Sequence, residues 1–260
     1  MDIKFSKYQG TGNDFIIINN ISNFFPKDDN KLISKLCDRK FGIGADGLIL
    51  IDNHSSLPFE MIYYNSDGFI GSMCGNGARC SVHFSFLNKI IKSKTKFNAF
   101  DGIHNGIVDH DLINISMSDV IGFEKYEDYL FIDSGSPHLV KYVQDVNSID
   151  LINVSQKIQH SNQFNEGVNV NFISKNSDNS FQIRTYERGV EDETLSCGTG
   201  AVALAVCLEI NSKINNDKVL IYTKGGELKV SLKKIESTYS DIWLSGGVEL
   251  VYSGEYNLDK

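Results

Sequence analysis

A six-residue motif occurs twice in this chain and constrains its fold more than any other feature. Residues 73–78 read Met-Cys-Gly-Asn-Gly-Ala and residues 196–201 read Ser-Cys-Gly-Thr-Gly-Ala, so a shift of 123 residues carries Cys74 onto Cys197. An apolar run with helical spacing follows each copy. We therefore expect each cysteine at the N-terminal end of a helix, where unpaired backbone N–H groups stabilise a thiolate.

The same shift aligns other features of the two halves. It places Gly12-Asn13 over Gly135-Ser136, Ile16-Ile17 over Leu139-Val140, Tyr63 over Tyr186, Asn65 over Arg188, and Gly102 over Gly225. Because one shift relates matched positions over most of each half, the chain is expected to contain two copies of one α/β unit. The expected halves are residues 1–118, joined by the last strand at about 250–260, and residues 119–249. We expect the two cysteine turns to face each other across a cleft.

Composition limits the classes of function open to the chain. Hydrophobic residues make up 41% and charged residues 22%, as in a soluble globular protein, and the net charge of −8 offers no broad attraction to nucleic acid or to an anionic membrane. The N-terminus lacks a signal-peptide apolar region, and no apolar run approaches the roughly 20 residues of a membrane span. We therefore expect a cytoplasmic protein without nucleic-acid or membrane partners.

The cysteines and glycines also exclude two kinds of site. Five cysteines are an odd number and contain no Cys-x-x-Cys pair, which argues against a disulfide scaffold or a zinc cluster, so no metal is expected. Residues 42–47 match the dinucleotide fingerprint, but an expected helix at 29–38 precedes them and a strand at 48–51 follows, which reverses the required order. No dinucleotide cofactor is expected. Cys37 and Cys80 are interpreted as packing residues.

The rest of the pattern predicts mainly strands. We expect them at 3–8, 15–18, 59–64, 96–100, 106–109 and 112–117 in the first half, and at 168–173, 181–186, 219–222, 228–232, 242–245 and 249–252 in the second. Helices are expected at 150–158 and 200–210. Asn13 lies in a glycine-rich turn between the first two strands, where it fits either an ordinary turn residue or a ligand contact.

The two cysteine motifs, together with Asn65-Ser66-Asp67-Gly68 and Tyr186-Glu187-Arg188-Gly189, resemble the diaminopimelate epimerase family over essentially the whole chain. The resemblance implies two pseudo-symmetric α/β domains, each a curled, mostly antiparallel sheet around a central helix, and a homodimer. It implies a cofactor-independent inversion of one α-carbon of LL-diaminopimelate to the meso isomer, in lysine and peptidoglycan precursor synthesis. Proline racemases of the wider superfamily typically have His where this chain has Asn76.

The resemblance also assigns roles to residues. Cys74 and Cys197 are implied to be the acid and the base on opposite faces of the carbon, with pKa values tuned by His138 and Glu187. The implied substrate contacts are the backbone N–H groups of Gly75, Asn76, Gly198 and Thr199 for the α-carboxylate, Arg188 with Asn65 and Asn169 for the distal carboxylate, and Asn13 with the Glu187 backbone for the amino group. Tyr252 resembles a dimer-contact residue.

Several of these residues have a simpler interpretation. Without the resemblance, His138 also fits a structural residue at a strand end, Glu187 and Arg188 fit a solvated ion pair, and Tyr252 fits a half-buried strand aromatic. Two further classes of function stay open. One is a racemase or isomerase for an amino acid without a distal carboxylate, and the other is a non-catalytic binder or thiol redox switch.

Two positions depart from the commonest family pattern. Gly47 stands where many relatives have a Gln that contacts substrate, and Ser136 stands where they have an Asn. Both changes shorten a polar side chain, leaving either space for water or an altered pocket. The sequence therefore predicts the type of reaction more firmly than the substrate.

Overall fold

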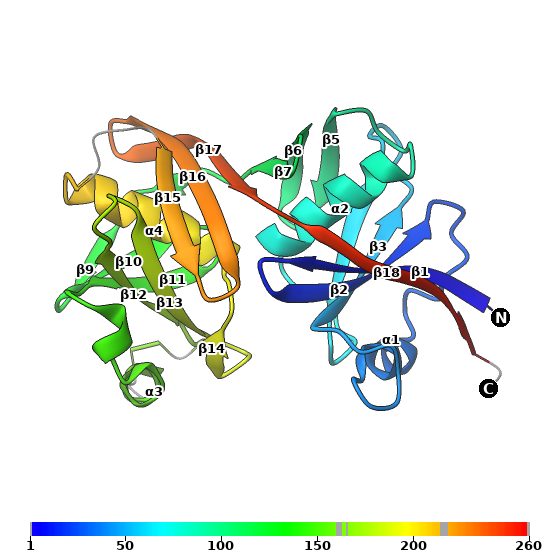
Figure 1. Ribbon diagram of the computed structural model, residues 1–260, viewed down its shortest axis with the longest axis horizontal. Helices are drawn as coiled ribbons and strands as arrows, with labels where there is room; N and C mark the ends of the chain where they lie inside the picture. The colour runs from blue at the N-terminus through cyan, green and yellow to red at the C-terminus, as the bar shows by residue number, and fades with distance from the viewer. Residues whose placement is uncertain (1, 160–162, 165, 214–217, 259–260) are drawn as a thin grey trace. The chain divides into compact units, whose positions relative to one another are not determined.

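The computed structural model describes residues 2–159, 163–164, 166–213 and 218–258. The chain divides into two compact units (Figure 1). The first comprises Met1–Ile115 and Gly246–Lys260, and the second comprises Ser116–Ser245. The closing strand of the chain therefore belongs to the first unit.

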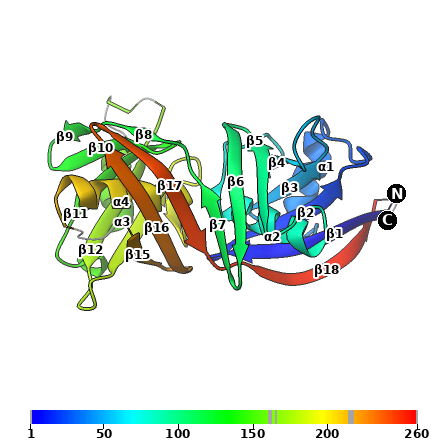
Figure 2. The same ribbon diagram turned by 90° about the horizontal axis from the view of Figure 1, so that it is seen from above.

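In the first unit, a mostly antiparallel sheet surrounds one buried helix. Its described elements are β1 (Asp2–Gly10), β2 (Asn13–Asn20), α1 (Asn30–Cys37), β3 (Gly47–Asp52), β4 (Glu60–Asn65), α2 (Gly75–Leu87), β5 (Lys94–Ala99), β6 (Gly102–Asp109), β7 (Leu112–Ser116) and β18 (Glu249–Asn257). The strands pair in the order β18-β1-β2-β3-β4-β5-β6-β7, and only the β2–β3 and β4–β5 pairs are parallel among these pairings. Figure 2 shows β1 and β18 side by side, which brings the two ends of the described chain together.

The second unit has the same construction. Its described elements are β8 (Val120–Ile121), β9 (Glu124–Tyr126), β10 (Tyr129–Asp133), β11 (Pro137–Tyr142), a 3-10 turn η1 (Val146–Ser148), α3 (Leu151–Gln159), β12 (Asn169–Lys175), β13 (Phe181–Glu187), β14 (Asp192–Thr194), α4 (Gly198–Ile210), β15 (Lys218–Thr223), β16 (Gly226–Ile235) and β17 (Thr238–Gly246). β11–β12 and β13–β15 are parallel, whereas β10–β11, β12–β13 and β15–β16 are antiparallel.

The two units therefore repeat one sequence of strand directions. The shift of 123 residues carries α2 onto α4 residue for residue, and both helices have 13 residues. It also superposes their caps, Cys74 on Cys197 at the N-terminal end and Asn88 on Asn211 at the C-terminal end. The predicted fold class, an α/β protein of two pseudo-symmetric units, is confirmed.

Helices α2 and α4 are the central helices of their units. α2 packs against β1, β2, β3, β4 and β6, and α4 packs against β10, β11, β12, β13 and β16. Small residues allow this close approach: a Cβ atom added at Gly77 would lie 2.9 Å from Ile49 Cδ1. Because strands cover these helices on several sides, their sequences lack the one-sided apolar stripe of a surface helix.

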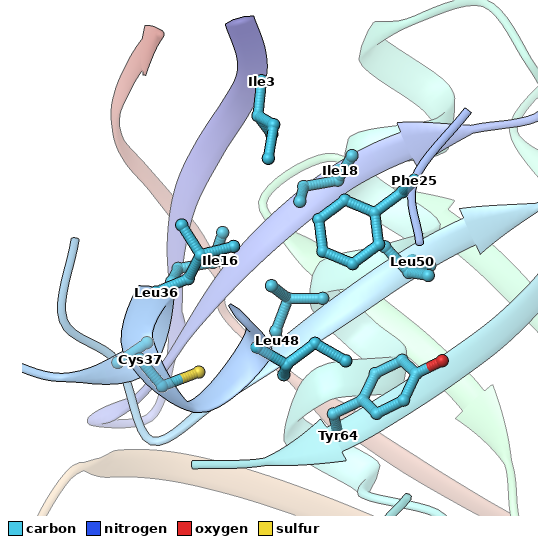
Figure 3. Close-up of a cluster of buried hydrophobic side chains, with 11 residues drawn as sticks. Ile3, Ile16, Ile18, Phe25, Leu36, Cys37, Leu48, Leu50 and Tyr64 are labelled. Atoms are coloured by element: carbon cyan, nitrogen blue, oxygen red, sulfur yellow. The ribbon is translucent and has the colours of Figure 1, made fainter. Parts of the chain in front are cut away.

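The first unit has a second apolar core between its sheet and α1 (Figure 3). It includes the buried side chains of Ile16 and Ile18 from β2, Leu48 and Leu50 from β3, and Leu36 and Cys37 from α1. Burial raises the pKa of the Cys37 thiol to about 12, so Cys37 stays protonated at neutral pH. The predicted packing role of Cys37 is confirmed.

The sequence pattern did not predict the strands β8, β9, β10 and β14. β9 reads Glu-Lys-Tyr and β14 reads Asp-Glu-Thr, so neither carries the apolar alternation that marks a strand. These short strands form because they pair with longer ones: β8 pairs with β17, β9 with β10, and β14 with β13. Among the described helices, none is both long enough and apolar enough to cross a membrane.

We predict that Leu48→Ala destabilises the protein by about 2–5 kcal/mol, because Leu48 is fully buried and its loss leaves a cavity in the core under α1. Urea denaturation gives the free energy of unfolding. Phe41→Ala is the matched control, since Phe41 is 80% exposed and its removal should change stability by less than about 0.5 kcal/mol. Equal losses in the two variants would contradict this description of the core.

Candidate active site

Cys74 occupies the N-cap position of α2. Its backbone is extended, with φ −111° and ψ 115°, and its Sγ atom accepts a hydrogen bond from Gly77 N at 3.5 Å. The side chain is half-buried. A thiolate here faces the first N–H groups of the helix and the positive end of its dipole.

The side chain of Asn13 lies beside this sulfur. Cys74 Sγ lies 3.6 Å from Asn13 Oδ1, and Asn76 Nδ2 donates to the same oxygen at 3.5 Å. Asn13 Nδ2 donates to Asp46 Oδ2 at 2.7 Å, so the amide presents its oxygen to the cysteine. That oxygen can accept a hydrogen bond from a thiol or from an amino group.

A charged network that the sequence analysis missed holds Asn13 and Asp46 in place. Arg39 donates to Asp14 at 2.6 Å and to Asp46 at 2.7 Å, and Lys7 forms an ion pair with Asp14 at 2.6 Å. Burial raises the pKa of Asp14, but the hydrogen bonds from Arg39 and Lys7 outweigh burial and hold that pKa far below its usual range. The Asp14 carboxylate therefore stays ionised at neutral pH.

Arg79 also lies beside the site and was not predicted from the sequence. It is fully buried in α2 and donates to Asn76 Oδ1 at 2.9 Å, to Thr11 Oγ1 at 3.1 Å and to Gly75 O at 3.3 Å. Burial lowers its pKa to about 10, which leaves it charged at neutral pH. These acceptors are all neutral, so Arg79 adds positive charge to the first turn of α2. An arginine in a buried apolar helix was the signal in the sequence.

The ring of Tyr63 lies close against Gly47 and Gly71. A Cβ atom added at Gly47 would lie 2.5 Å from Tyr63 Cε2, and one added at Gly71 would lie 2.6 Å from the same ring. An aromatic ring thus lies where a side chain at position 47 would begin. Asn65 pairs with Gly47 across the sheet and is exposed at the end of β4.

In the second unit, Cys197 occupies the N-cap position of α4. Its backbone has φ −126° and ψ 117°, and Sγ accepts a hydrogen bond from Gly200 N at 3.4 Å. Thr199 Oγ1 lies 3.4 Å from the same sulfur. Cys197 is only 8% exposed, so it is more deeply buried than Cys74.

His138 lies on β11, fully buried, and reaches Cys197 through Thr199. Its Nε2 atom is 2.9 Å from Thr199 Oγ1, and its Nδ1 atom is 3.0 Å from Asn171 Nδ2. Burial lowers the pKa of His138 to about 3, and the positive charge of Arg188 lowers it too. His138 is therefore neutral at neutral pH and can influence the cysteine through hydrogen bonds but not as a cation.

Asn169 organises the other predicted residues of this unit. Its Nδ2 donates to Ser136 Oγ at 3.0 Å and to Pro137 O at 3.1 Å, while its Oδ1 accepts from Arg188 N at 3.0 Å. The serine at position 136 thus keeps a polar contact despite its short side chain. Arg188 also donates through Nη1 to Glu166 O at 3.1 Å, and the preceding residue, Glu187, ends β13 half-buried.

Direct contacts join some of the predicted site residues within each unit. Asn13, Cys74 and Asn76 meet in the first unit, and a separate set meets in the second: His138, Asn169, Arg188, Cys197 and Thr199. Tyr252 lies on β18, 46% exposed, with its ring 5.9 Å from that of Phe5 in an edge-to-face contact. Within the described ranges, no three His, Cys, Asp or Glu side chains gather as metal ligands.

The chain is similar to known proteins over nearly its whole length. The family model for diaminopimelate epimerase matches residues 5–112 and 130–251. The chain is 47% identical to the diaminopimelate epimerase of Flavobacterium psychrophilum, over 96% of this chain and 98% of the relative. It is 36% identical to the diaminopimelate epimerase of Chlorobaculum tepidum, over 96% of this chain and 99% of the relative.

Solved structures share the fold at low sequence identity. A PhzF-family phenazine biosynthesis protein of Bacillus anthracis matches with a TM-score of 0.79 and 12% identity, covering 99% of this chain and 100% of its own. A hydroxyproline epimerase of Agrobacterium vitis matches with a TM-score of 0.73 and 14% identity, covering 100% of this chain and 93% of its own. At these identities the likeness concerns the fold alone.

We predict that iodoacetamide at pH 8 alkylates Cys74 about tenfold faster than it alkylates the packing cysteines. Burial raises the pKa of Cys37 and Cys207 to about 12 and that of Cys80 further, whereas Cys74 is half-buried at a helix N-terminus. Peptide mass spectrometry over a time course measures each rate. Labelling of Cys37 or Cys207 as fast as Cys74 would contradict the assignment.

Proposed function

This chain belongs to the diaminopimelate epimerase family, and we propose that it inverts one α-carbon of LL-2,6-diaminopimelate to give meso-diaminopimelate. The observation that carries the proposal is the equivalent placement of Cys74 and Cys197, each the N-cap of the central helix of its unit. The names of the relatives support the choice of substrate.

Inversion of a carbon by proton exchange needs a base on one face and an acid on the other. In the proposed reaction, the thiolate of one cysteine takes the α-proton, and the thiol of the other donates its proton to the opposite face. After one turnover the first cysteine is the thiol and the second is the thiolate, so the roles are exchanged for the reverse reaction. This scheme uses no cofactor.

Loss of the α-proton places negative charge on the substrate's α-carboxylate. We assign its binding to the backbone N–H groups of Gly75 and Asn76 in α2 and of Gly198 and Thr199 in α4, which precede the intrahelical hydrogen bonds. A donor aimed at charge that develops in the transition state typically contributes about 2.7–4 kcal/mol. The buried charge of Arg79 would reinforce the N-terminus of α2.

The remaining roles concern the rest of the substrate and the assembly. Arg188, with Asn65 and Asn169, is proposed to bind the distal carboxylate, and Asn13 with the Glu187 backbone to bind the reacting amino group. His138 and Glu187 are proposed to tune the cysteines. A cytoplasmic homodimer with Tyr252 at its interface completes the proposal, supported by the exposed ring on β18.

We predict that Cys74→Ser and Cys197→Ser each abolish activity while the protein stays folded. Serine can still cap each helix, but its hydroxyl ionises far above the pKa of a thiol and cannot supply the base. Incorporation of solvent deuterium at the α-carbon of diaminopimelate, without added cofactor and under reducing conditions, measures the reaction.

Cys37→Ala and Cys80→Ala are the matched controls for these variants, since both thiols lie in the packed interior. They should retain activity as long as the protein folds. Absence of deuterium incorporation by the unaltered protein would refute the proposed function. Tight binding of diaminopimelate without exchange would support the non-catalytic alternative.

We predict that Arg188→Met raises the KM for diaminopimelate about 100-fold or more, because a charge-assisted bidentate contact with the distal carboxylate is lost. Steady-state kinetics with diaminopimelate measures this effect. Lys92→Met, which removes an exposed positive charge from the first unit, is the control and should leave KM unchanged. An unchanged KM in Arg188→Met would favour an enzyme for an amino acid without a distal carboxylate.

A further inference from the structure

The side chain of Asn171, on β12, has only one orientation that satisfies its neighbours. Its Nδ2 group lies 3.1 Å from Leu139 O and 3.4 Å from Asn169 O, and carbonyl oxygens can only accept. Its Oδ1 accepts from the hydroxyl of Thr185 at 2.9 Å. A flipped amide would set an oxygen against two carbonyl oxygens, so the NH2 group must face β11. Asn171 is fully buried, so water does not offer an alternative.

This orientation determines the tautomer of His138. Asn171 Nδ2 has two hydrogens, and its two nearest acceptors are His138 Nδ1 at 3.0 Å and Leu139 O at 3.1 Å, so Nδ1 must carry a lone pair. A neutral imidazole with a bare Nδ1 carries its hydrogen on Nε2. Asn169 Nδ2 is also 3.5 Å from Nε2, but this amide donates its two hydrogens to Ser136 Oγ and Pro137 O. It therefore does not compete for the tautomer.

The hydrogen on Nε2 then orients the hydroxyl of Thr199. His138 Nε2 lies 2.9 Å from Thr199 Oγ1 and donates to it, which leaves the hydroxyl hydrogen free to point elsewhere. Cys197 Sγ lies 3.4 Å from Oγ1, within the range of a hydrogen bond to sulfur. With Gly200 N at 3.4 Å on the same sulfur, a thiolate at Cys197 receives two donors.

We propose that Asn171, His138 and Thr199 form a directed hydrogen-bond chain that ends on Cys197 Sγ and stabilises its thiolate. Asn171 and Thr199 are then positioning residues: Asn171 selects the histidine tautomer, and the Thr199 hydroxyl delivers the hydrogen bond. Only the expected effect on epimerisation rests on the proposed function. The effect on the thiol of Cys197 does not depend on any substrate.

Other titratable groups lie on the strands packed against α4 or next to their ends. They include Asp133, His138, Glu187, Arg188, Lys224 and Glu227. Asp133 accepts from Gly135 N, Lys224 pairs with Glu193, and Glu227 pairs with Lys229. Because Thr199 carries no charge, replacing it tests the hydrogen bond without altering these groups.

The experiment measures the pKa of Cys197 in the full chain from the pH dependence of its alkylation by iodoacetamide, read peptide by peptide. Thr199→Val removes the hydroxyl at nearly constant volume and should raise the pKa of Cys197 by about 1–2, since a hydrogen bond to a charged group is lost. Thr199→Ser retains a hydroxyl and should keep the pKa near its original value. Cys74 in the same samples is the internal control and should not change.

Asn171→Leu tests the other end of the chain. It removes the donor to Nδ1 at similar volume, so His138 can place its hydrogen on Nδ1, and Thr199 can then donate to Nε2 instead of to Cys197. The pKa of Cys197 should rise as in Thr199→Val. An unchanged pKa in Thr199→Val, or equal shifts in the valine and serine variants, would overturn the proposal.

The unaltered protein provides a test that does not depend on the folding of any variant. In protein labelled with 15N-histidine, His138 should show a lone pair on Nδ1 and a hydrogen on Nε2 at every pH between 5 and 9, because its pKa is about 3. A hydrogen on Nδ1 would overturn the proposal.

Activity provides a further test. The apparent pKa in the pH profile of epimerisation that reports ionisation of Cys197 should shift with the pKa of this thiol. Should the unaltered protein fail to epimerise diaminopimelate while Cys197 responds to Thr199→Val, only the proposed function fails.

Discussion

The site depends on a hydrogen bond from a backbone N–H group to a cysteine sulfur at the N-terminus of a helix. Cys74 Sγ accepts from Gly77 N and Cys197 Sγ accepts from Gly200 N, each closing the first turn of a central helix. Side chains with an oxygen acceptor are the usual N-caps. A cysteine at this position caps the helix less strongly, but its thiol can lose a proton near neutral pH. The glycines in each motif allow the turn to pack tightly: a Cβ atom at Gly200 would lie 2.9 Å from Asn171 Oδ1.

The two halves share a backbone but surround their cysteines with different chemistry. Beside Cys74 lies the oxygen of Asn13, held by Asp46 and Arg39, which suits a thiol or an amino group as donor. Beside Cys197 lies the hydroxyl of Thr199, which can itself donate. The caps of the two central helices are equivalent, while the groups beside them differ. A reaction with one acid and one base can use such a difference.

Both neighbourhoods depend on buried polar groups whose hydrogen bonds determine their orientation. Arg79 is completely buried and donates to three oxygen atoms, and it stays charged at neutral pH because burial lowers its high pKa only to about 10. His138 is completely buried and stays neutral because the desolvation of an imidazolium outweighs its gain from hydrogen bonds. Burial lowers the pKa of both groups, but the two start from different ordinary pKa values. The guanidinium therefore keeps its proton at neutral pH, whereas the imidazole stays unprotonated.

The sequence by itself determined the duplication, the two N-cap cysteines and the central helices, because a repeated motif and long apolar runs are local signals. It also correctly predicted that Cys37 packs in a core. Only the tertiary structure revealed Asp46, Arg39, Arg79 and Asn171 as partners of the site, although alternate asparagines at 169 and 171 in a buried strand were a visible hint. It likewise placed the Tyr63 ring over Gly47. These contacts join residues distant in the chain, so their distances and donor directions depend on strand pairing and packing, which no local pattern records.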